Sequence, residues 1–319
     1  MLQERGNMSF SGTVKEEMSR HIPSARHCQI AEIASILHFC GVYTEESVLI
    51  QAENEAVIRK CFTLLKKTFN INTDIIQKRT EKSAVYSILL TDESEVRQVL
   101  QAVKFMDADG NCRNLREPVS SLLIKNACCQ RAFIRGAFLA SGSMSDPEKS
   151  YHLEIVCILL SQAEQIREIL QSFEVEARIV QRKKYQVVYM KDGTGISDFL
   201  NIAEAHVSLM EFENCRILKE MRNSVNRRVN CETANIGKTV SASTRQVDDI
   251  LFLQEKYGFA NLPDNLREMA EIRLAYQDAP LRELGAYLDP PVGKSGVNHR
   301  LRKLSELADK LREESEAWQ

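Results

Sequence analysis

The residues best suited to chemistry lie near the C-terminus, where two amphipathic patterns meet. Residues 281–311 predict two helices joined by a turn at 289–293, which holds two prolines and a glycine. The second helix would begin near Ser295, a favourable N-cap residue. The pair predicts a helix-turn-helix over about residues 280–312, with a turn longer than the usual three or four residues. The side chains expected to be buried are Leu281, Leu284, Leu288, Val297, Leu301, Leu304, Ala308 and Leu311.

The outer face of the second helix begins with polar and basic side chains. The N-terminal residues of such a helix meet base edges in the major groove of DNA. Asn298 suits adenine and Arg302 suits guanine, whereas Arg300 and Lys303 are better placed for phosphates. A solvated basic face on a helical hairpin is the alternative. The candidate DNA-binding residues of this helix are Lys294, Ser295, Asn298, His299, Arg300, Arg302 and Lys303.

A second basic stretch lies upstream, between Arg216 and Arg245. It contains seven Lys or Arg residues and only two acids, Glu220 and Glu232. A predicted helix at 209–230 places positive charge and amides along one side, which suits a phosphate backbone. A solvated helix is again the alternative. The candidate phosphate contacts here are Arg216, Lys219, Arg227 and Arg228.

The rest of the chain contains a long repeat. A helix over residues 10–20 comes first, and two α–ββ–α–ββ–α units then follow at about 28–106 and 128–204. Only helices are predicted after residue 204, at 209–230, 243–257, 264–276, 281–288 and 295–313. This change in composition predicts a domain boundary near residues 205–218.

Each repeat opens with a helix of small and apolar residues, IASILHFCG at 33–41 and IRGAFLASG at 134–142. Both strings resemble the LAGLIDADG motif of homing endonucleases, in which two such helices form the interface between two α/β halves. The small residues Ala34, Ser35, Gly136 and Ala137 would let the helices approach closely.

The resemblance also locates the positions on which catalysis would depend. In that nuclease family the last acid of each motif helix holds a divalent metal, but Cys40 and Ser141 stand at those positions, and both are poor Mg²⁺ ligands. A literal DADG at 107–110 follows a different helix and predicts a turn. Asp146 and Glu148, in a loop beyond Ser141, are the alternative ligands. We therefore predict that the protein has no catalytic activity. An active Mg²⁺-dependent endonuclease is the alternative.

Composition limits the remaining possibilities. The 319 residues suit two or three domains, and the net charge of −2 indicates no particular partner. The nine cysteines include no CxxC pair and no His/Cys set with zinc spacing, so we expect small core residues in a reducing cytosol, no metal site and no cofactor. No signal peptide and no membrane-spanning run is expected, which predicts a cytoplasmic protein.

Three strings together are similar to the WhiA family: MSFSGTVKEEMSR at 8–20, SVNRRVNCETANIGKTV at 224–240 and LRELGAYLDPPVGKSGVNHRLRKL at 281–304. The resemblance implies a nucleoid-associated DNA-binding protein of Gram-positive bacteria. It would regulate transcription in sporulation, or act in cell division and chromosome segregation. Double-stranded DNA is the implied partner, with another regulator or division protein as a further candidate. A protein scaffold at the division site is the alternative.

The predicted fold class is therefore α+β: a LAGLIDADG-like pseudo-two-fold α/β body followed by an all-α helix-turn-helix domain. The predicted boundaries are an N-terminal helix or leader at 1–27, the body at 28–215, the helical DNA-binding domain at 216–313 and a tail at 314–319. Whether residues 1–7 are native stays open. The sheet of the second repeat would carry Arg178, Arg182, Lys183 and Lys184, either for weak DNA binding or for docking a protein.

Overall fold

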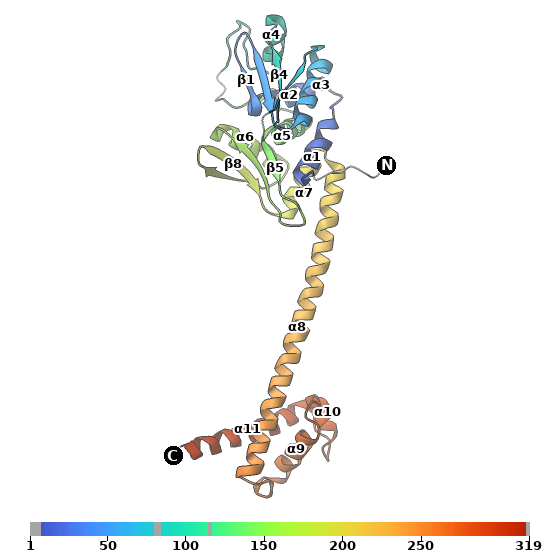
Figure 1. Ribbon diagram of the computed structural model, residues 1–319, viewed down its shortest axis with the longest axis vertical. Coiled ribbons are helices and arrows are strands. Elements are labelled where there is room, and N and C mark those ends of the chain that lie inside the picture. The colour runs from blue at the N-terminus through green and yellow to red at the C-terminus, as the bar shows by residue number, and fades with distance from the viewer. Residues whose placement is uncertain (1–7, 80–83, 114–116, 317–319) are drawn as a thin grey trace. The chain divides into compact units, whose positions relative to one another are not determined.

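The structure is a computed structural model that describes residues 8–79, 84–113 and 117–316 (Figure 1). Residues 1–7 of the predicted leader and 317–319 of the predicted tail lie outside the described residues. The chain divides into two compact units, Met1–Glu220 and Met221–Gln319, which we call the body and the helical unit. The division falls within helix α8 (His206–Lys256), close to the boundary expected from composition.

The first half of the body follows helix α1 (Phe10–Arg20) and contains a four-stranded antiparallel sheet. Its strand order is β1-β2-β4-β3, so the central strands β2 and β4 pair along their length, with Ile50 opposite Ile88. The elements are α2 (Arg26–Cys40), β1 (Gly41–Tyr43), β2 (Val48–Ala52), α3 (Glu55–Phe69), β3 (Ile75–Arg79), β4 (Ala84–Leu90) and α4 (Glu93–Ala102).

The second half repeats this order, as the sequence predicted. Its sheet has the order β5-β6-β8-β7, and Gly142 at the start of β5 occupies the place of Gly41 at the start of β1. Strand β5 was not predicted, because a three-residue strand is too short to show alternation. The elements are α5 (Ala127–Ser141), β5 (Gly142–Met144), β6 (Leu153–Cys157), α6 (Leu160–Ser172), β7 (Arg178–Arg182), β8 (Tyr185–Met190) and α7 (Gly193–Ile202).

Helices α2 and α5 pack against each other at the centre of the body, between the two sheets (Figure 1). A Cβ atom on Gly136 would lie 2.8 Å from the Cβ of Ser35 and 2.9 Å from the Glu32 carbonyl oxygen, so only glycine allows this approach. The Ser35 hydroxyl donates to the Phe133 carbonyl across the interface at 2.7 Å. The predicted close packing of two small-residue helices is therefore present.

A buried charge network crosses the same interface. The Glu32 carboxylate accepts from Lys60 Nζ at 2.6 Å and from Arg135 Nε at 2.9 Å, and all three side chains are almost fully buried. Arg135 also pairs with Glu204. Burial lowers the pKa of Lys60 to about 8, although Glu32 opposes this effect. Nothing in the sequence pattern indicated this network, since its members lie far apart along the chain.

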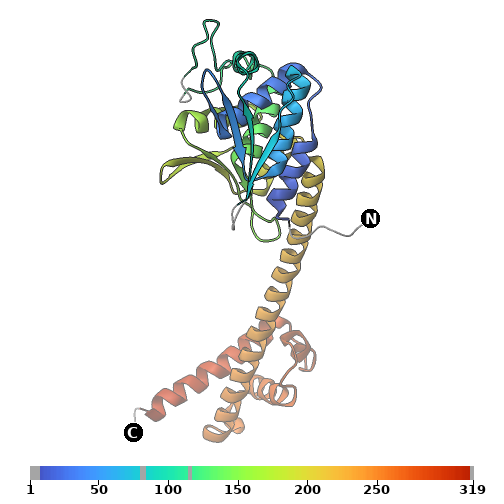
Figure 2. The ribbon, with the colours of Figure 1, turned by 45° about the horizontal axis from the view of Figure 1, so that its top comes forward.

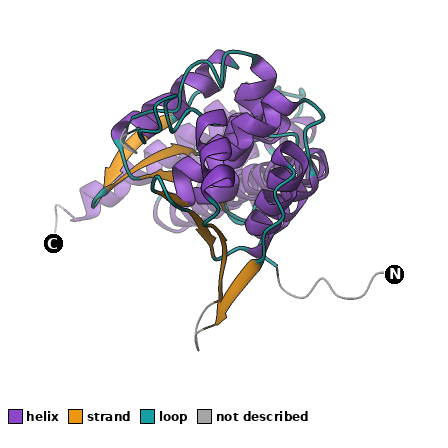
Figure 3. Cartoon of the chain, turned by 90° about the horizontal axis from the view of Figure 1, so that it is seen from above, coloured by secondary structure: helices purple, strands orange, loops and turns teal. Residues whose placement is uncertain are grey.

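One hydrophobic core runs through both halves of the body, and the helices cover one face of each sheet (Figures 2 and 3). In β2, for example, Val48 and Ile50 are fully buried whereas Gln51 is exposed. The outer strands β3 and β7 are largely exposed along their length. The opposite face of each sheet is thus open to solvent.

The helical unit has its own core, formed by the end of α8 with α9 (Asp264–Ala275), α10 (Leu281–Ala286) and α11 (Lys294–Glu316). A short 3-10 helix at Phe259–Asn261 follows α8. The predicted break between helices at 209–230 and 243–257 is wrong, because α8 is continuous. The intervening residues contain one glycine and no proline, and a single glycine costs a helix only about 1 kcal/mol.

Candidate nucleic-acid interface

The position of α11 is fixed by its apolar side and by the turn before it. Val297, Leu301, Leu304 and Ala308 are buried in the core of the helical unit, together with Leu284 and Leu288 from the α10 region, while Leu281 and Leu311 are partly buried. These residues follow the predicted pattern. Helix α10 is shorter than predicted, and the connection over residues 287–293 is correspondingly long.

Gly285 lets the connection pass directly over α10. A Cβ atom there would lie 2.0 Å from the Val292 carbonyl oxygen. The Val292 amide donates to the Gly285 carbonyl at 2.9 Å, and the Asp289 amide donates to Glu268 of α9 at 2.9 Å. Helix α11 begins at Lys294, with the Gly293 carbonyl accepting its first hydrogen bonds. The predicted N-cap role of Ser295 is therefore wrong, since Ser295 lies inside the first turn.

The exposed side of α11 is unequally charged along its length. Residues 294–305 contain three exposed cations, Lys294, Arg302 and Lys303, and no acid. Arg302 Nε contacts Glu306 at 3.2 Å, although both side chains are more than half exposed. Among the described residues, Lys294 and Lys303 form no ion pair. Ser295, Asn298 and His299 are exposed on the same half of the helix, so this segment presents cations and hydrogen-bonding groups together.

Arg300 differs from the other predicted contacts. Its side chain is only 20% exposed, and its guanidinium lies 3.6 Å from the Glu268 carboxylate and 3.4 Å from the Asn265 carbonyl oxygen. Arg300 therefore joins α11 to α9 and does not lie free on the outer face as predicted. The periodicity places it at the edge of the buried side, where a long arginine can reach a neighbouring helix.

Acidic side chains of α8 and α11 anchor the second half of α11 to α8. Buried Asp249 of α8 accepts from Ser305 Oγ at 2.6 Å and from Arg312 at 2.7 Å. Arg245 of α8 contacts Asp309 at 3.0 Å. These polar contacts hold the second half of α11 against α8, whereas Lys294 and Lys303 in the first half form no ion pair among the described residues.

The upstream basic stretch is divided between the two units. In the body, Arg216 contacts Glu213 at 2.8 Å and Ser197 at 3.3 Å, and the Lys219 ammonium lies 4.7 Å from the Tyr151 ring centre. Arg227 and Arg228 belong to a segment of α8, residues 220–242, in which every residue is exposed. The cations of the predicted stripe therefore lie in two different environments: Arg216 and Lys219 pack against neighbouring side chains, whereas Arg227 and Arg228 are solvated.

The sheet of the second repeat also carries the predicted basic residues. Arg178, Arg182, Lys183 and Lys184 are all exposed. Arg182 contacts Glu154 at 2.8 Å, and the Lys184 ammonium lies 5.3 Å from the Tyr185 ring centre. Part of the positive charge on this face is thus balanced by the sheet itself.

Cys40 and Ser141, which are predicted to stand in place of the nuclease acids, both make hydrogen bonds within their own helices. Cys40 Sγ donates to the Ile36 carbonyl at 3.2 Å, and Ser141 Oγ donates to the Ala137 carbonyl at 3.2 Å, each within its own helix. Burial raises the pKa of Cys40 to about 12, so its sulfur is a neutral thiol. The literal DADG at 107–110 forms the predicted turn, in which the Asp107 carboxylate accepts from the Asn111 amide.

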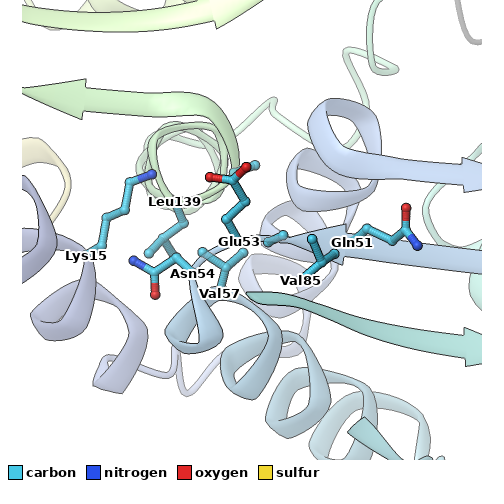
Figure 4. Close-up of a pocket in the computed structure, with 9 residues that line it drawn as sticks. Lys15, Gln51, Glu53, Asn54, Val57, Val85 and Leu139 are labelled. Atoms are coloured by element: carbon cyan, nitrogen blue, oxygen red, sulfur yellow. The ribbon is translucent and has the colours of Figure 1, made fainter. Parts of the chain in front are cut away.

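A shallow pocket lies beside the end of α5. It is lined by Lys15, Glu53, Asn54, Leu139 and Ala140 among others, and Figure 4 shows the Lys15 and Glu53 side chains facing it. Glu53 is the single carboxylate among its lining residues. Mg²⁺ is held by carboxylates and other hard oxygen ligands, and the described lining residues add to Glu53 only the side-chain amide oxygens of Gln51 and Asn54.

One group of cysteines in the body lies beside a histidine. His27, Cys28, Cys128 and Cys129 bring their potential ligand atoms within 4.8 Å of one another. Zinc-site spacing in a sequence concerns ligands close together along the chain, whereas these two pairs lie about a hundred residues apart. In the part of the chain that the structure describes, no helix is long and apolar enough to cross a membrane.

Comparison with known proteins gives the same organisation. Family models match in three parts: the WhiA N-terminal LAGLIDADG-like domain at residues 26–106, the WhiA LAGLIDADG-like domain at 130–222 and the WhiA C-terminal HTH domain at 225–308. The chain is 52% identical to a probable cell division protein WhiA of Lachnoclostridium phytofermentans, over 96% of this chain and 100% of the relative. The corresponding protein of Alkaliphilus oremlandii is 44% identical over 96% and 98%.

A solved structure supports the fold. The crystal structure of full-length WhiA from Thermatoga maritima superposes with a TM-score of 0.59 at 24% identity, covering 95% of this chain and 99% of that one. The LAGLIDADG-like body and the C-terminal helix-turn-helix predicted from the sequence are thereby confirmed. The chain belongs to the WhiA family.

Proposed function

We propose that this protein binds double-stranded DNA through the first half of α11 and does not cleave it. The observation that carries the proposal is the outer side of α11 over residues 294–305, where exposed Lys294, Arg302 and Lys303 lie beside Asn298 and His299 and the sequence contains no acid. A helix of this kind presents its N-terminal residues to the major groove. Arginine and asparagine are suited to guanine and adenine, and lysines to phosphates.

Within this interface the residues have different roles. Asn298 and Arg302 read base edges, with Ser295 and His299 as further base or sugar contacts. Lys294 and Lys303 neutralise phosphates, and the solvated cations Arg227 and Arg228 of α8 add a second phosphate contact. Arg216, Lys219 and Arg300, which pack against neighbouring side chains, contribute to the position of their helices.

The second part of the proposal is that the protein does not cleave DNA. The resemblance to LAGLIDADG nucleases implies a metal-binding acid at the end of each central helix, and a neutral thiol and a hydroxyl occupy those places here. Incubation of the purified protein with plasmid and Mg²⁺ or Mn²⁺ should leave the plasmid intact. Site-specific nicking that disappears in a Glu53→Gln or Asp146→Asn variant would overturn this part.

For the cell, we propose a nucleoid-associated cytoplasmic factor that acts in cell division, chromosome segregation or the transcription of sporulation genes. The names of the relatives, probable cell division proteins, support the first of these roles. Another regulator or division protein would bind alongside it, and the open sheet face of the body offers a surface for such a partner.

A genome-wide map of bound sites tests the proposal. We expect discrete sites for the wild-type protein, transcript changes at some of them, and loss of both in a Lys294→Ala, Asn298→Ala, Arg302→Ala variant. If the division phenotype persists in that variant while the sites are lost, a protein scaffold explains the cellular role instead.

A further inference from the structure

The pseudo-two-fold axis of the body brings together four side chains that bind soft metals. Residues 33–41 and 134–142 are equivalent in the two halves, and the same alignment pairs His27 with Cys128 and Cys28 with Cys129. Each pair lies in the first turn of its helix, α2 or α5. The Cys28 amide donates to the Ala25 carbonyl at 3.0 Å, and the Cys129 amide donates to the Asn126 carbonyl at 2.9 Å, so the two thiols have equivalent backbone positions.

The four side chains converge on one point. His27 Nδ1 lies 3.1 Å from Cys129 Sγ, which belongs to the opposite helix, and 3.3 Å from Cys28 Sγ. All four potential ligand atoms lie within 4.8 Å of one another. In a tetrahedral zinc site with bonds of about 2.0–2.3 Å, neighbouring ligand atoms lie roughly 3.3–3.8 Å apart. The observed separations therefore need only small side-chain movements to surround an ion.

The environment of the cluster also suits a closed metal site. Cys28 and Cys129 are buried, 6% and 3% exposed, in a small apolar cluster with Ala31 and Ala132. His27 and Cys128 are exposed and leave a path for the ion. Neither helix has a side-chain hydrogen bond at its N-cap.

We propose that His27, Cys28, Cys128 and Cys129 form a structural Zn²⁺ site that joins the two halves of the body. Three thiolates and one imidazole are a known ligand set for structural zinc and leave no open position for a substrate. The ion would link the first turns of α2 and α5, at the end of the helix pair opposite Cys40 and Ser141. Binding releases the thiol protons, because the thiolate is the ligand.

The direct test is the zinc content of the full-length protein. We expect one tightly held zinc ion per chain after dialysis of reduced apoprotein against ZnSO₄ and removal of excess metal. Because Cys28 and Cys129 are buried, their loss could unfold the body, so the decisive variants are at the exposed ligands, Cys128→Ser and His27→Ala. Each should lower zinc affinity by at least about tenfold, since even outer partners of a metal ligand contribute that much.

The matched control is Cys231→Ser, which removes an exposed thiol from α8 in the helical unit and should leave zinc binding unchanged. Cobalt substitution should give the visible absorption of tetrahedral Co²⁺ with thiolate charge-transfer bands, reduced in Cys128→Ser. The proposal is overturned if the reduced wild-type chain retains no zinc, or if both exposed-ligand variants bind zinc as tightly as wild type. A metal-free protein with a disulfide within this cluster would also overturn it.

Discussion

Positive charge is used differently in the two units. In the body, Arg135 and Lys60 are buried against Glu32, and Arg216 and Arg182 each contact a carboxylate. In the helical unit, the first half of α11 exposes Lys294, Arg302 and Lys303, and residues 294–305 contain no acid. The same residue types thus hold the fold of the body together and stay available on the first half of α11. What decides between the two uses is the position of the counter-charge.

The largest effect should come from removing the counter-charge in the body. Glu32→Gln leaves Lys60 and Arg135 buried without their shared carboxylate. Loss of one partner from a buried ion pair costs about 3–5 kcal/mol of unfolding free energy. Denaturant unfolding would measure this loss of unfolding free energy, with hydrogen exchange in peptides of α2 and α5 as the probe.

The matched change in the helical unit is Glu268→Gln, which removes the carboxylate beside Arg300. Both side chains are partly exposed, so we expect a loss of about 0–1 kcal/mol. Equal losses for the two variants would contradict the contrast between structural and available charge.

The second prediction concerns acid stability, and it applies to the body alone. His38 is 5% exposed, its Nε2 has no hydrogen-bond partner among the described residues, and burial lowers its pKa from 6.5 to about 4. Above pH 6.5 the imidazole is neutral in both folded and unfolded chains. As the pH falls from 6.5 to 4, only the unfolded chain gains the proton, so the body loses stability, by about 3 kcal/mol.

His38→Leu should remove this part of the pH dependence. The difference in unfolding free energy between variant and wild type at pH 7 and at pH 4.5 isolates the histidine from the carboxylates that titrate in both chains. A pH dependence unchanged by the substitution would show that His38 is not responsible.

The smallest predicted effect separates the two basic surfaces by their response to salt. Each phosphate contact contributes about 0.9 to the slope of log affinity against log salt concentration. Lys303→Ala should therefore reduce that slope by about one, whereas Lys183→Ala on the sheet should leave it unchanged. A similar reduction from both would place DNA on the body as well as on α11.

Much of the fold was accessible from the sequence because the hydrophobic patterns are local. The helical spacing over residues 10–20 predicted α1 to the residue, and the alternating helix and strand-pair patterns predicted the order of elements in both repeats. The repeat then predicted the two halves. The continuity of α8 was missed because the composition of residues 231–242 is typical of a linker, although a solvated helix can have the same composition.

The candidate interface was predicted only in part, for a physical reason. Helical spacing assigns residues such as Lys294 and Asn298 to an outer face, and the structure exposes them. Spacing does not reveal which neighbour a long side chain reaches, so the contact of Arg300 with Glu268 was missed. It reveals even less where distant residues meet, as with His27 and Cys129.

The central claim, that α11 is the DNA-binding surface, is tested most directly by titrating fragments from the bound-site map with two variants. Each bidentate base contact contributes about 1–3 kcal/mol, so Lys294→Ala, Asn298→Ala, Arg302→Ala should weaken binding about a hundredfold or more. The matched body variant, Lys183→Ala, Lys184→Ala, should bind as wild type does. The account is contradicted if the α11 variant retains wild-type affinity, or if the body variant loses affinity to the same extent.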